Sequence, residues 1–194
     1  TLLFLIQSAD DNLAMKMNSD VLKIIRSHPY CKHLLGKNNK TTERGFQVQG
    51  ATSGRNLSVT ARGIMSNVTG FRCDYLVFDD AEVPNTARSD KHREDLRNRI
   101  SESTRLLHPD GARIFIGTPH ATESIYPEMI DRGAASFRVA FLQDVEGEWP
   151  FCTGTPSWPE RWTEELIQRV QQSCQGKSEW FSQYMLIPML AEES

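Results

Sequence analysis

Apolar positions change their spacing along the chain, and the spacing predicts alternating strands and helices. The run from Leu2 to Ile6 is continuously apolar, which is typical of a buried strand. Apolar side chains then recur at helical spacing from Leu13 to Ile25, and Pro29 ends the pattern. We therefore expect a strand followed at once by an amphipathic helix, which is half of a βαβ unit.

The middle of the chain continues the same pattern. Residues 45–49 and 57–61 predict a hairpin, and residues 75–78 form an apolar strand that ends in Asp79. Residues 89–107 are highly charged with an apolar stripe, and the turn Pro-Asp-Gly at 109–111 leads to a second buried strand at 113–116. Two apolar strands joined by an amphipathic helix predict a parallel sheet with a right-handed crossover.

The last third of the chain changes character. A helix at residues 123–132 and a strand at 137–142 are expected, followed by a Pro-rich connector that contains Trp149, Trp158 and Trp162. Two short helices follow, one that begins near Thr163 and one that ends at Pro188. We expect an α/β core over residues 1–145 and a connector with a small helical subdomain over 146–194. The tryptophans are expected to pack in a core rather than to stack on nucleic-acid bases.

Composition narrows the picture only a little. Of the 194 residues, 39% are hydrophobic and 24% are charged, which is ordinary for a globular protein, and the net charge of −3 still allows a local basic patch. The four cysteines lack metal-ligand spacing, so we expect reduced thiols, and no apolar run approaches the ~18 residues of a membrane span. Because the chain begins at Thr1, directly in a core strand, we expect residues of the same fold to precede it.

Acidic residues stand where a strand of the predicted sheet ends. Ligands of open parallel sheets bind beyond the carboxyl ends of the strands. Asp79 and Asp80 occupy such an end, and Glu82 follows closely. One acid could hold Mg²⁺ opposite nucleotide phosphates while the second orients or deprotonates the attacking water. The alternative is an acidic pair that only caps the loop before Pro84.

Other polar residues near strand ends are weaker candidates. The strand at 113–116 exits through Gly117 and Thr118, which could lie near a reacting phosphate or could simply form a turn. Arg62 and Arg72 lie in the segment that leads to the acidic strand, and either could stabilise phosphate charge from a neighbouring subunit or remain solvated. His120 is expected to be a surface or capping residue.

Taken together, the motifs resemble the large terminase subunit of tailed bacteriophages, most closely the T7-like DNA maturase branch. The resemblance rests on TGFRCDYLVFDDAEVPN at residues 69–85 and RIFIGTP at 113–119 with Ile125 and Tyr126 after it. It continues with WPERW at 158–162 and FSQYMLIP at 181–188. The order and spacing of these segments agree over most of residues 45–190.

The resemblance implies a P-loop NTPase fold of the RecA-like (ASCE) class and an ATPase that uses ATP and Mg²⁺. It implies that Asp79 is the Walker B metal ligand and that Asp80, where the family commonly has Glu, or Glu82 is the catalytic acid. Gly117 and Thr118 would belong to the coupling motif that senses hydrolysis. Arg72, with Arg62 as second choice, would be the arginine that acts on a neighbouring subunit.

The resemblance also implies partners and a location. The intact protein would be a ring of subunits that threads double-stranded DNA through a portal into a procapsid, together with a small terminase subunit, in the cytoplasm of the bacterial host and without a membrane. The sequence contains no GxxxxGK[ST] loop to hold the phosphates. A C-terminal nuclease domain is expected beyond the connector. We therefore expect a partial ATPase domain that does not hydrolyse ATP alone.

Two other functions fit the residues. The acids Asp74, Asp79, Asp80 and Glu82 could bind two metal ions in a metal-dependent nuclease. That reading is disfavoured because all four lie on one strand and its exit. The chain could also be a non-catalytic fragment whose sheet serves as an assembly or DNA-docking surface.

Overall fold

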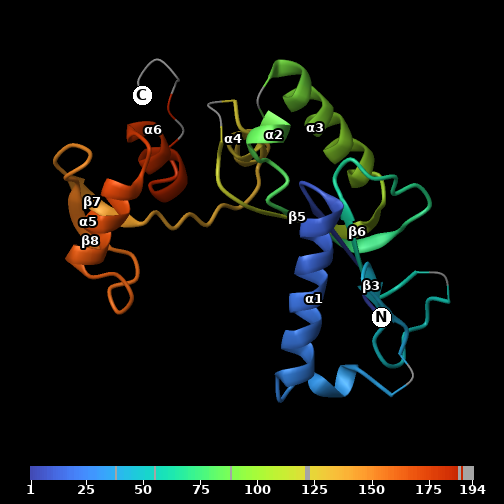
Figure 1. Ribbon diagram of the computed structural model, residues 1–194. Coiled ribbons are helices and arrows are strands. Elements are labelled where there is room, and N and C mark those ends of the chain that lie inside the picture. The colour runs from blue at the N-terminus through green and yellow to red at the C-terminus, as the bar shows by residue number, and fades with distance from the viewer. Residues whose placement is uncertain (38, 55, 88, 121–122, 188, 190–194) are drawn as a thin grey trace. The chain divides into compact units, whose positions relative to one another are not determined.

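The chain forms two compact units, Thr1–Gly117 and Thr118–Ser194. The computed structural model describes residues 1–37, 39–54, 56–87, 89–120, 123–187 and 189, and Figure 1 shows the elements of both units. The boundary between these units lies after Gly117, earlier than the boundary expected at residue 145. The expected division into an ATPase core and a connector with a helical subdomain stays a prediction. Among the described residues, no helix combines the length and the apolar character that crossing a membrane requires.

The first unit is built on a six-stranded sheet with the strand order β2-β3-β4-β1-β5-β6. Its elements in chain order are β1 (Phe4–Ser8), α1 (Asp11–Ser27), the 3-10 helix η1 (Lys32–Leu34), β2 (Thr41–Thr42), β3 (Gly45–Phe46), β4 (Val59–Gly63), β5 (Cys73–Asp79), α2 (Pro84–Ala87), α3 (Asp90–Thr104) and β6 (Leu107–Ile116). Strands β4, β1, β5 and β6 are parallel, and β3 pairs antiparallel with β4. The predicted α/β class, the parallel sheet and the hairpin are confirmed.

Helix α1 covers one face of this sheet. Asp10 caps it by accepting a hydrogen bond from the Leu13 N–H at 2.9 Å. Ala14 and Leu22 pack with Ile6 and with Val59 and Ala61 of β4 in one core cluster. The opposite face is also covered, because the alternating side chains Leu5, Leu76 and Phe78 are at most 1% exposed.

Helix α3 and strand β6 follow the predicted crossover, but β6 differs in burial. Ser89 caps α3, and Leu96 and Ile100 form its buried stripe as expected. The predicted turn at 109–111 lies within β6, where the register with β5 shifts. We expected a buried strand at 113–116, yet Ile114 and Ile116 are 42% and 48% exposed. The burial prediction was wrong because β6 is the outermost strand of the sheet.

The second unit is smaller and contains short helices and a two-stranded sheet. Its elements are α4 (Ile125–Asp131), β7 (Leu142–Glu146), β8 (Thr153–Pro156), α5 (Glu164–Ser173), α6 (Lys177–Glu179) and the π-helix η2 (Trp180–Tyr184). The helix predicted after Thr163 is confirmed, with Thr163 as its cap. The strand predicted at 137–142 was wrong: Phe137 is 94% exposed, and the strand begins at Leu142, where pairing with β8 begins.

Aromatic side chains form much of the core of this unit. Trp180 is fully buried and stacks on Tyr184, with the ring centroids 5.3 Å apart. Phe141 contacts Trp162, Trp180 and Tyr184 edge to face. Packing is therefore the role of most aromatic residues in the tail, as expected, while Trp158 remains 55% exposed.

Candidate functional site

Three strands bring polar groups to the carboxyl edge of the sheet. The register aligns Ser8 at the end of β1 with Gly63 at the end of β4 and with Asp79 at the end of β5. Because neighbouring residues of parallel strands in register point to the same face, Ser8 and Asp79 share one face there. This edge is where open parallel sheets bind ligands.

Asp79 lies half-buried in the middle of this edge. Burial raises the pKa of its carboxyl group above the ordinary 3.8, and the negative charge of Asp80 raises it further. Both effects disfavour the charged carboxylate. A bound cation would offset them, and carboxylate oxygens are ligands that Mg²⁺ prefers.

Asp80 and Glu82 differ sharply in their surroundings. Asp80 has a left-handed backbone with φ of 45°, which Asp tolerates better than most residues, and its N–H donates to the Ile116 carbonyl at 2.9 Å. Its side chain is exposed, whereas Glu82 is only 1% exposed. Of the two candidate catalytic acids, only Asp80 is open to solvent.

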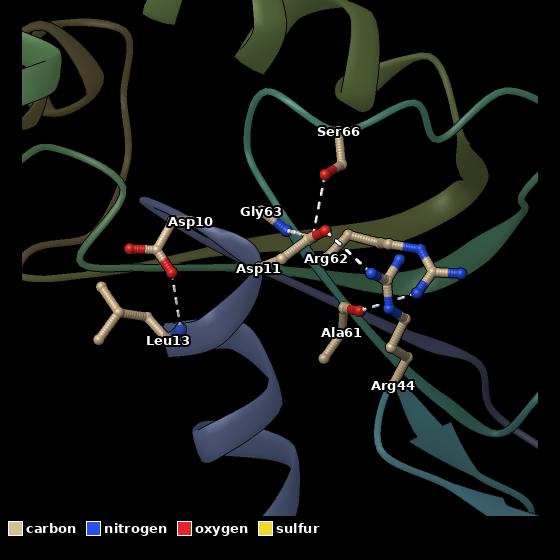
Figure 2. A network of polar contacts seen from close by, with 8 residues as sticks. All are labelled: Asp10, Asp11, Leu13, Arg44, Ala61, Arg62, Gly63 and Ser66. Carbon is tan, nitrogen blue, oxygen red and sulfur yellow. Dashed lines mark hydrogen bonds and ion pairs between the residues drawn. The ribbon is translucent and has the colours of Figure 1, made fainter.

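Asp11 organises the neighbouring part of the edge, as Figure 2 shows. Its carboxylate accepts hydrogen bonds from the Gly63 N–H at 2.6 Å and from the Ser66 hydroxyl at 2.9 Å, and it pairs with Arg44 at 3.3 Å. The bond from Gly63, followed by that from Ser66 and the positive charges of Arg44 and Arg62, lowers the pKa of Asp11. The network ties the start of α1 to the loop that leaves β4.

Arg62 and Arg72 lie at opposite edges of the sheet. Arg62 is the penultimate residue of β4, one position before the row of Asp79, and its guanidinium lies 5.8 Å from the Phe71 ring centroid. Burial, then the charge of Arg44, lowers the pKa of Arg62, and Asp11 opposes this. Arg72 directly precedes β5, so at about 3.3 Å per residue it lies roughly 20 Å from Asp79. The structure therefore places the second-choice arginine at the site edge and the first choice away from it.

Gly117 and Thr118 fall on either side of the division between the compact units. The Thr118 hydroxyl donates to Gln183 Oε1 at 3.3 Å, and Gln183 Nε2 lies 3.2 Å from His120 Nδ1. Sequence reasoning missed this three-residue cluster in the second unit. The sign that could have revealed it is that all three residues lie in or beside the motifs that carry the family resemblance.

Two further polar residues of the edge were also missed. Gln7 and Ser8 end the apolar strand β1 and are 0% and 1% exposed. Within the described part of the chain, the Gln7 amide atoms and the Ser8 hydroxyl have no hydrogen-bond partner. The signal that could have revealed them is a Gln-Ser pair directly after a continuous apolar run. Such a pair is expected to be buried with the strand, and buried polar groups normally need a hydrogen-bond partner.

The four acids of the nuclease hypothesis are not gathered at one point. Asp74 stands near the start of β5, where its carboxylate accepts the Leu3 N–H at 2.7 Å. Asp79 ends the same strand, five residues and about 16 Å away. In the part of the chain that the structure describes, no three His, Cys, Asp or Glu residues form a metal-binding group. The edge offers Asp79 and Asp80, which suits one cation whose other ligands come from a bound phosphate.

Comparison with known proteins supports the resemblance described above. No family model matches the chain. The chain is 27% identical over 170 residues to a protein described as the large terminase subunit of Enterobacteria phage T3. The match covers 76% of this chain and 29% of that protein, so the chain spans less than a third of its relative. The resemblance is thereby confirmed: the chain is similar to part of a phage terminase large subunit.

Proposed function

We propose that this chain is a segment of the ATP-hydrolysing motor of a viral DNA-packaging terminase. The observation that carries the proposal is the pair Asp79 and Asp80 at the carboxyl end of β5, a strand inside a mostly parallel sheet. Similarity to the T3 subunit supports a role in phage DNA packaging. The motor itself, its nucleotide and its metal are part of the proposal.

In this proposal Asp79 holds Mg²⁺ together with the phosphates of ATP. When bound, the ion would neutralise charge on the phosphate oxygens. Asp79 suits this role because it is half-buried and close to a second carboxylate, so its charge lacks compensation from the protein. Asp80 orients or deprotonates the attacking water, since its carboxylate is exposed whereas Glu82 is enclosed.

Arginines supply positive charge to the same reaction. Arg62 stands one residue before the last residue of β4, in the row next to Asp79, so we favour it over Arg72 for a role at this edge. Arg72 could reach a nucleotide only if that nucleotide were bound to another copy, because it lies at the far edge of its own sheet. Gly117 and Thr118 would transmit the state of the nucleotide to the second unit, in which Thr118 contacts Gln183.

The proposed fold is the RecA-like P-loop class with one strand and its phosphate loop supplied from outside this sequence. The outermost position of strand β6 in the sheet supports this, since an added parallel strand would pair at that edge. Without a GxxxxGK[ST] loop, the chain alone is expected not to hydrolyse ATP.

The partners follow from the same proposal. The whole motor would act on double-stranded DNA and would work as a homo-oligomeric ring with a portal, a procapsid and a small terminase subunit. Its place of action would be the cytoplasm of the bacterial host during virion assembly. Each of these partners is proposed from the similarity to the T3 protein.

A chimaeric terminase tests the proposal. The segment of the T3 large subunit that aligns with this chain would be replaced by the residues of this chain, and DNA-dependent ATP hydrolysis would be measured. We expect hydrolysis by the chimaera and a loss of at least about a hundredfold on Asp79→Asn, as for a residue that stabilises transition-state charge. Asp20→Asn, an exposed acid of α1, is the matched control and should leave the rate unchanged.

Two outcomes would contradict the proposal. One is a chimaera that folds cooperatively and assembles but hydrolyses no ATP. The other is an Asp79→Asn chimaera that is as active as the Asp20→Asn control. Substitution of Asp80 and Glu82 separately then assigns the catalytic acid, and we expect the larger loss for Asp80→Asn.

A further inference from the structure

A groove of about 860 Å³ opens in the first unit between the β4–β5 loop and the carboxyl-terminal half of α3. Residues 64–70 and Arg72 form the loop wall of the groove. The helix wall comes from Arg99, Glu102, Ser103 and Arg105. No local sequence pattern indicates this groove, because its two walls are about thirty residues apart along the chain.

Two of its arginines mark the amino edge of the sheet. Arg72 directly precedes Cys73, the first residue of β5, and Arg105 lies two residues before β6 begins. The Cys73 N–H donates to the Leu106 carbonyl at 3.0 Å, which holds the two strand entries side by side. At about 3.3 Å per residue, this edge lies roughly 20 Å from Asp79. Arg72 and Arg105 are therefore remote from Asp79, although the loop wall of the groove begins at Ile64, directly after the last residue of β4 at the carboxyl edge.

The charge of the groove is positive, although the whole chain has a net charge of −3. Arg72, Arg99 and Arg105 face a single acid, Glu102, which pairs with Arg99 at 2.9 Å. Arg72 donates to the neighbouring Phe71 carbonyl at 2.8 Å. Neither Arg72 nor Arg105 forms an ion pair with any residue that the structure describes. Two guanidinium groups are thus left to bind an anion from outside.

We propose that this groove binds the backbone phosphates of duplex DNA through Arg72, Arg99 and Arg105. This rests on the proposed function, which supplies DNA as the partner. Guanidinium forks match phosphate oxygens, and the polar side chains of Asn67 and Thr69 in the loop wall can add hydrogen bonds. Contacts of this kind carry no sequence information, which suits a protein that moves along DNA.

The lining favours backbone phosphates over a free nucleotide. No aromatic side chain is among the described residues that line the groove, so a base has nothing to stack on. Its one acid is already paired with Arg99, while the exposed carboxylate of Asp80 lies at the other edge of the sheet. A volume of about 860 Å³ also exceeds the size of one phosphate group, so more than one backbone phosphate fits.

Titration of a short fluorescent DNA duplex with this chain, at several salt concentrations, tests the groove. No nucleotide or metal is added. In the double variant Arg72→Gln and Arg105→Gln, each lost arginine should weaken DNA binding about tenfold or more. That is the usual effect of removing a hydrogen bond to a charged group. The slope of log Kd against log salt should fall by about 0.9 for each phosphate contact removed. Glu102→Gln should bind more tightly, because it removes the one acid.

The control is Arg26→Gln, which removes the same charge from the last turn of α1, outside the groove lining. Equal losses in the control and the double variant would overturn the proposal. The proposal would also be overturned if millimolar ATP displaced the DNA and Glu102→Gln left DNA affinity unchanged. That result would indicate a nucleotide pocket. Because this assay omits ATP and the chimaera assay depends on Asp79, the groove and the proposed motor function can fail separately.

Discussion

The two edges of the sheet in Thr1–Gly117 differ in charge and in how that charge is held. At the carboxyl edge, the Asp11 carboxylate is held by hydrogen bonds and an ion pair. The carboxylates of Asp79 and Asp80 are adjacent there, and their like charges repel. At the amino edge, Arg72 and Arg105 line an open groove. The carboxylate of Asp74, near the start of β5, accepts a hydrogen bond from the Leu3 N–H. One sheet thus separates the edge proposed to bind a cation from the edge proposed to bind phosphate.

The loop from β4 to β5 links these edges. It leaves the carboxyl edge at Gly63 and reaches the amino edge at Arg72. Asp11 holds the first turn of this loop through Gly63 and Ser66, and residues 64–70 with Arg72 form one wall of the groove. The geometry of the arginine groove therefore depends on Asp11 at the opposite edge. Substitutions at each edge can show how much each contributes to the stability of the fold.

The largest expected effect comes from Gly63→Ala. A β-carbon at Gly63 would lie 2.7 Å from the Asp11 nitrogen and 2.8 Å from the Asp10 carbonyl carbon. Since the backbone must shift, we expect a loss of about 3 kcal/mol in the free energy of unfolding. Urea denaturation measures it. Gly54→Ala, where nothing lies within 4 Å, is the control and should change stability little.

Asp11→Ala should have the next largest effect, about 2 kcal/mol of lost stability at neutral pH, because it removes hydrogen bonds to a charged group. The lowered pKa of Asp11 sets the pH dependence. Its contribution is present above the ordinary pKa of 3.8 and is lost as pH falls through the lower folded value. Urea midpoints from pH 7 downward should therefore converge for the two proteins. A constant difference at all pH values would contradict the network.

Asp79→Asn should act in the opposite direction and stabilise the fold by roughly 0.2–1 kcal/mol at neutral pH, the usual size of a partly exposed charge effect. The pKa of Asp79 is raised, so the folded protein holds that proton more tightly. The cost of the charge appears as pH rises from 3.8 through the folded pKa and stays constant above it. A destabilised Asp79→Asn protein at pH 7 would show that the carboxylate is satisfied within the fold.

The smallest effect on stability is expected at the amino edge. Arg72→Gln and Arg105→Gln should each change the free energy of unfolding by no more than about 0.5 kcal/mol, because exposed side chains without ion pairs contribute little. Thermal unfolding followed by circular dichroism measures it. A loss comparable to that of Asp11→Ala would mean that these arginines support the fold rather than a ligand.

Local sequence patterns were sufficient for the central elements. The apolar run before Asp79, the charged helix with Leu96 and Ile100, and the hairpin into β4 all follow from side-chain periodicity. The burial of β6 could not be predicted in this way, because an apolar run does not tell whether a strand is central or outermost. The strand expected at 137–142 was wrong for a related reason: pairing with β8 decides where β7 begins.

The site was predictable only in part. The position of Asp79 and Asp80 at a strand end could be predicted from the sequence, and their roles stay predictions. The different positions of Arg62 and Arg72 in the sheet required the topology. Both lie in the same segment of sequence, yet one precedes the carboxyl edge and the other the amino edge. The bonds of Asp11 to Gly63 and Ser66 span more than fifty residues, so no local pattern indicates them.

Manganese binding to this chain, followed by electron paramagnetic resonance, tests the division between the two edges most directly. Titrated without nucleotide, the chain should bind a single Mn²⁺ weakly through Asp79, since the remaining ligands of such an ion come from a phosphate. Asp79→Asn should abolish that binding, while the Arg72→Gln and Arg105→Gln double variant should leave it unchanged. Two tightly bound ions without nucleotide, or binding that survives Asp79→Asn, would contradict a single cation site at the carboxyl edge.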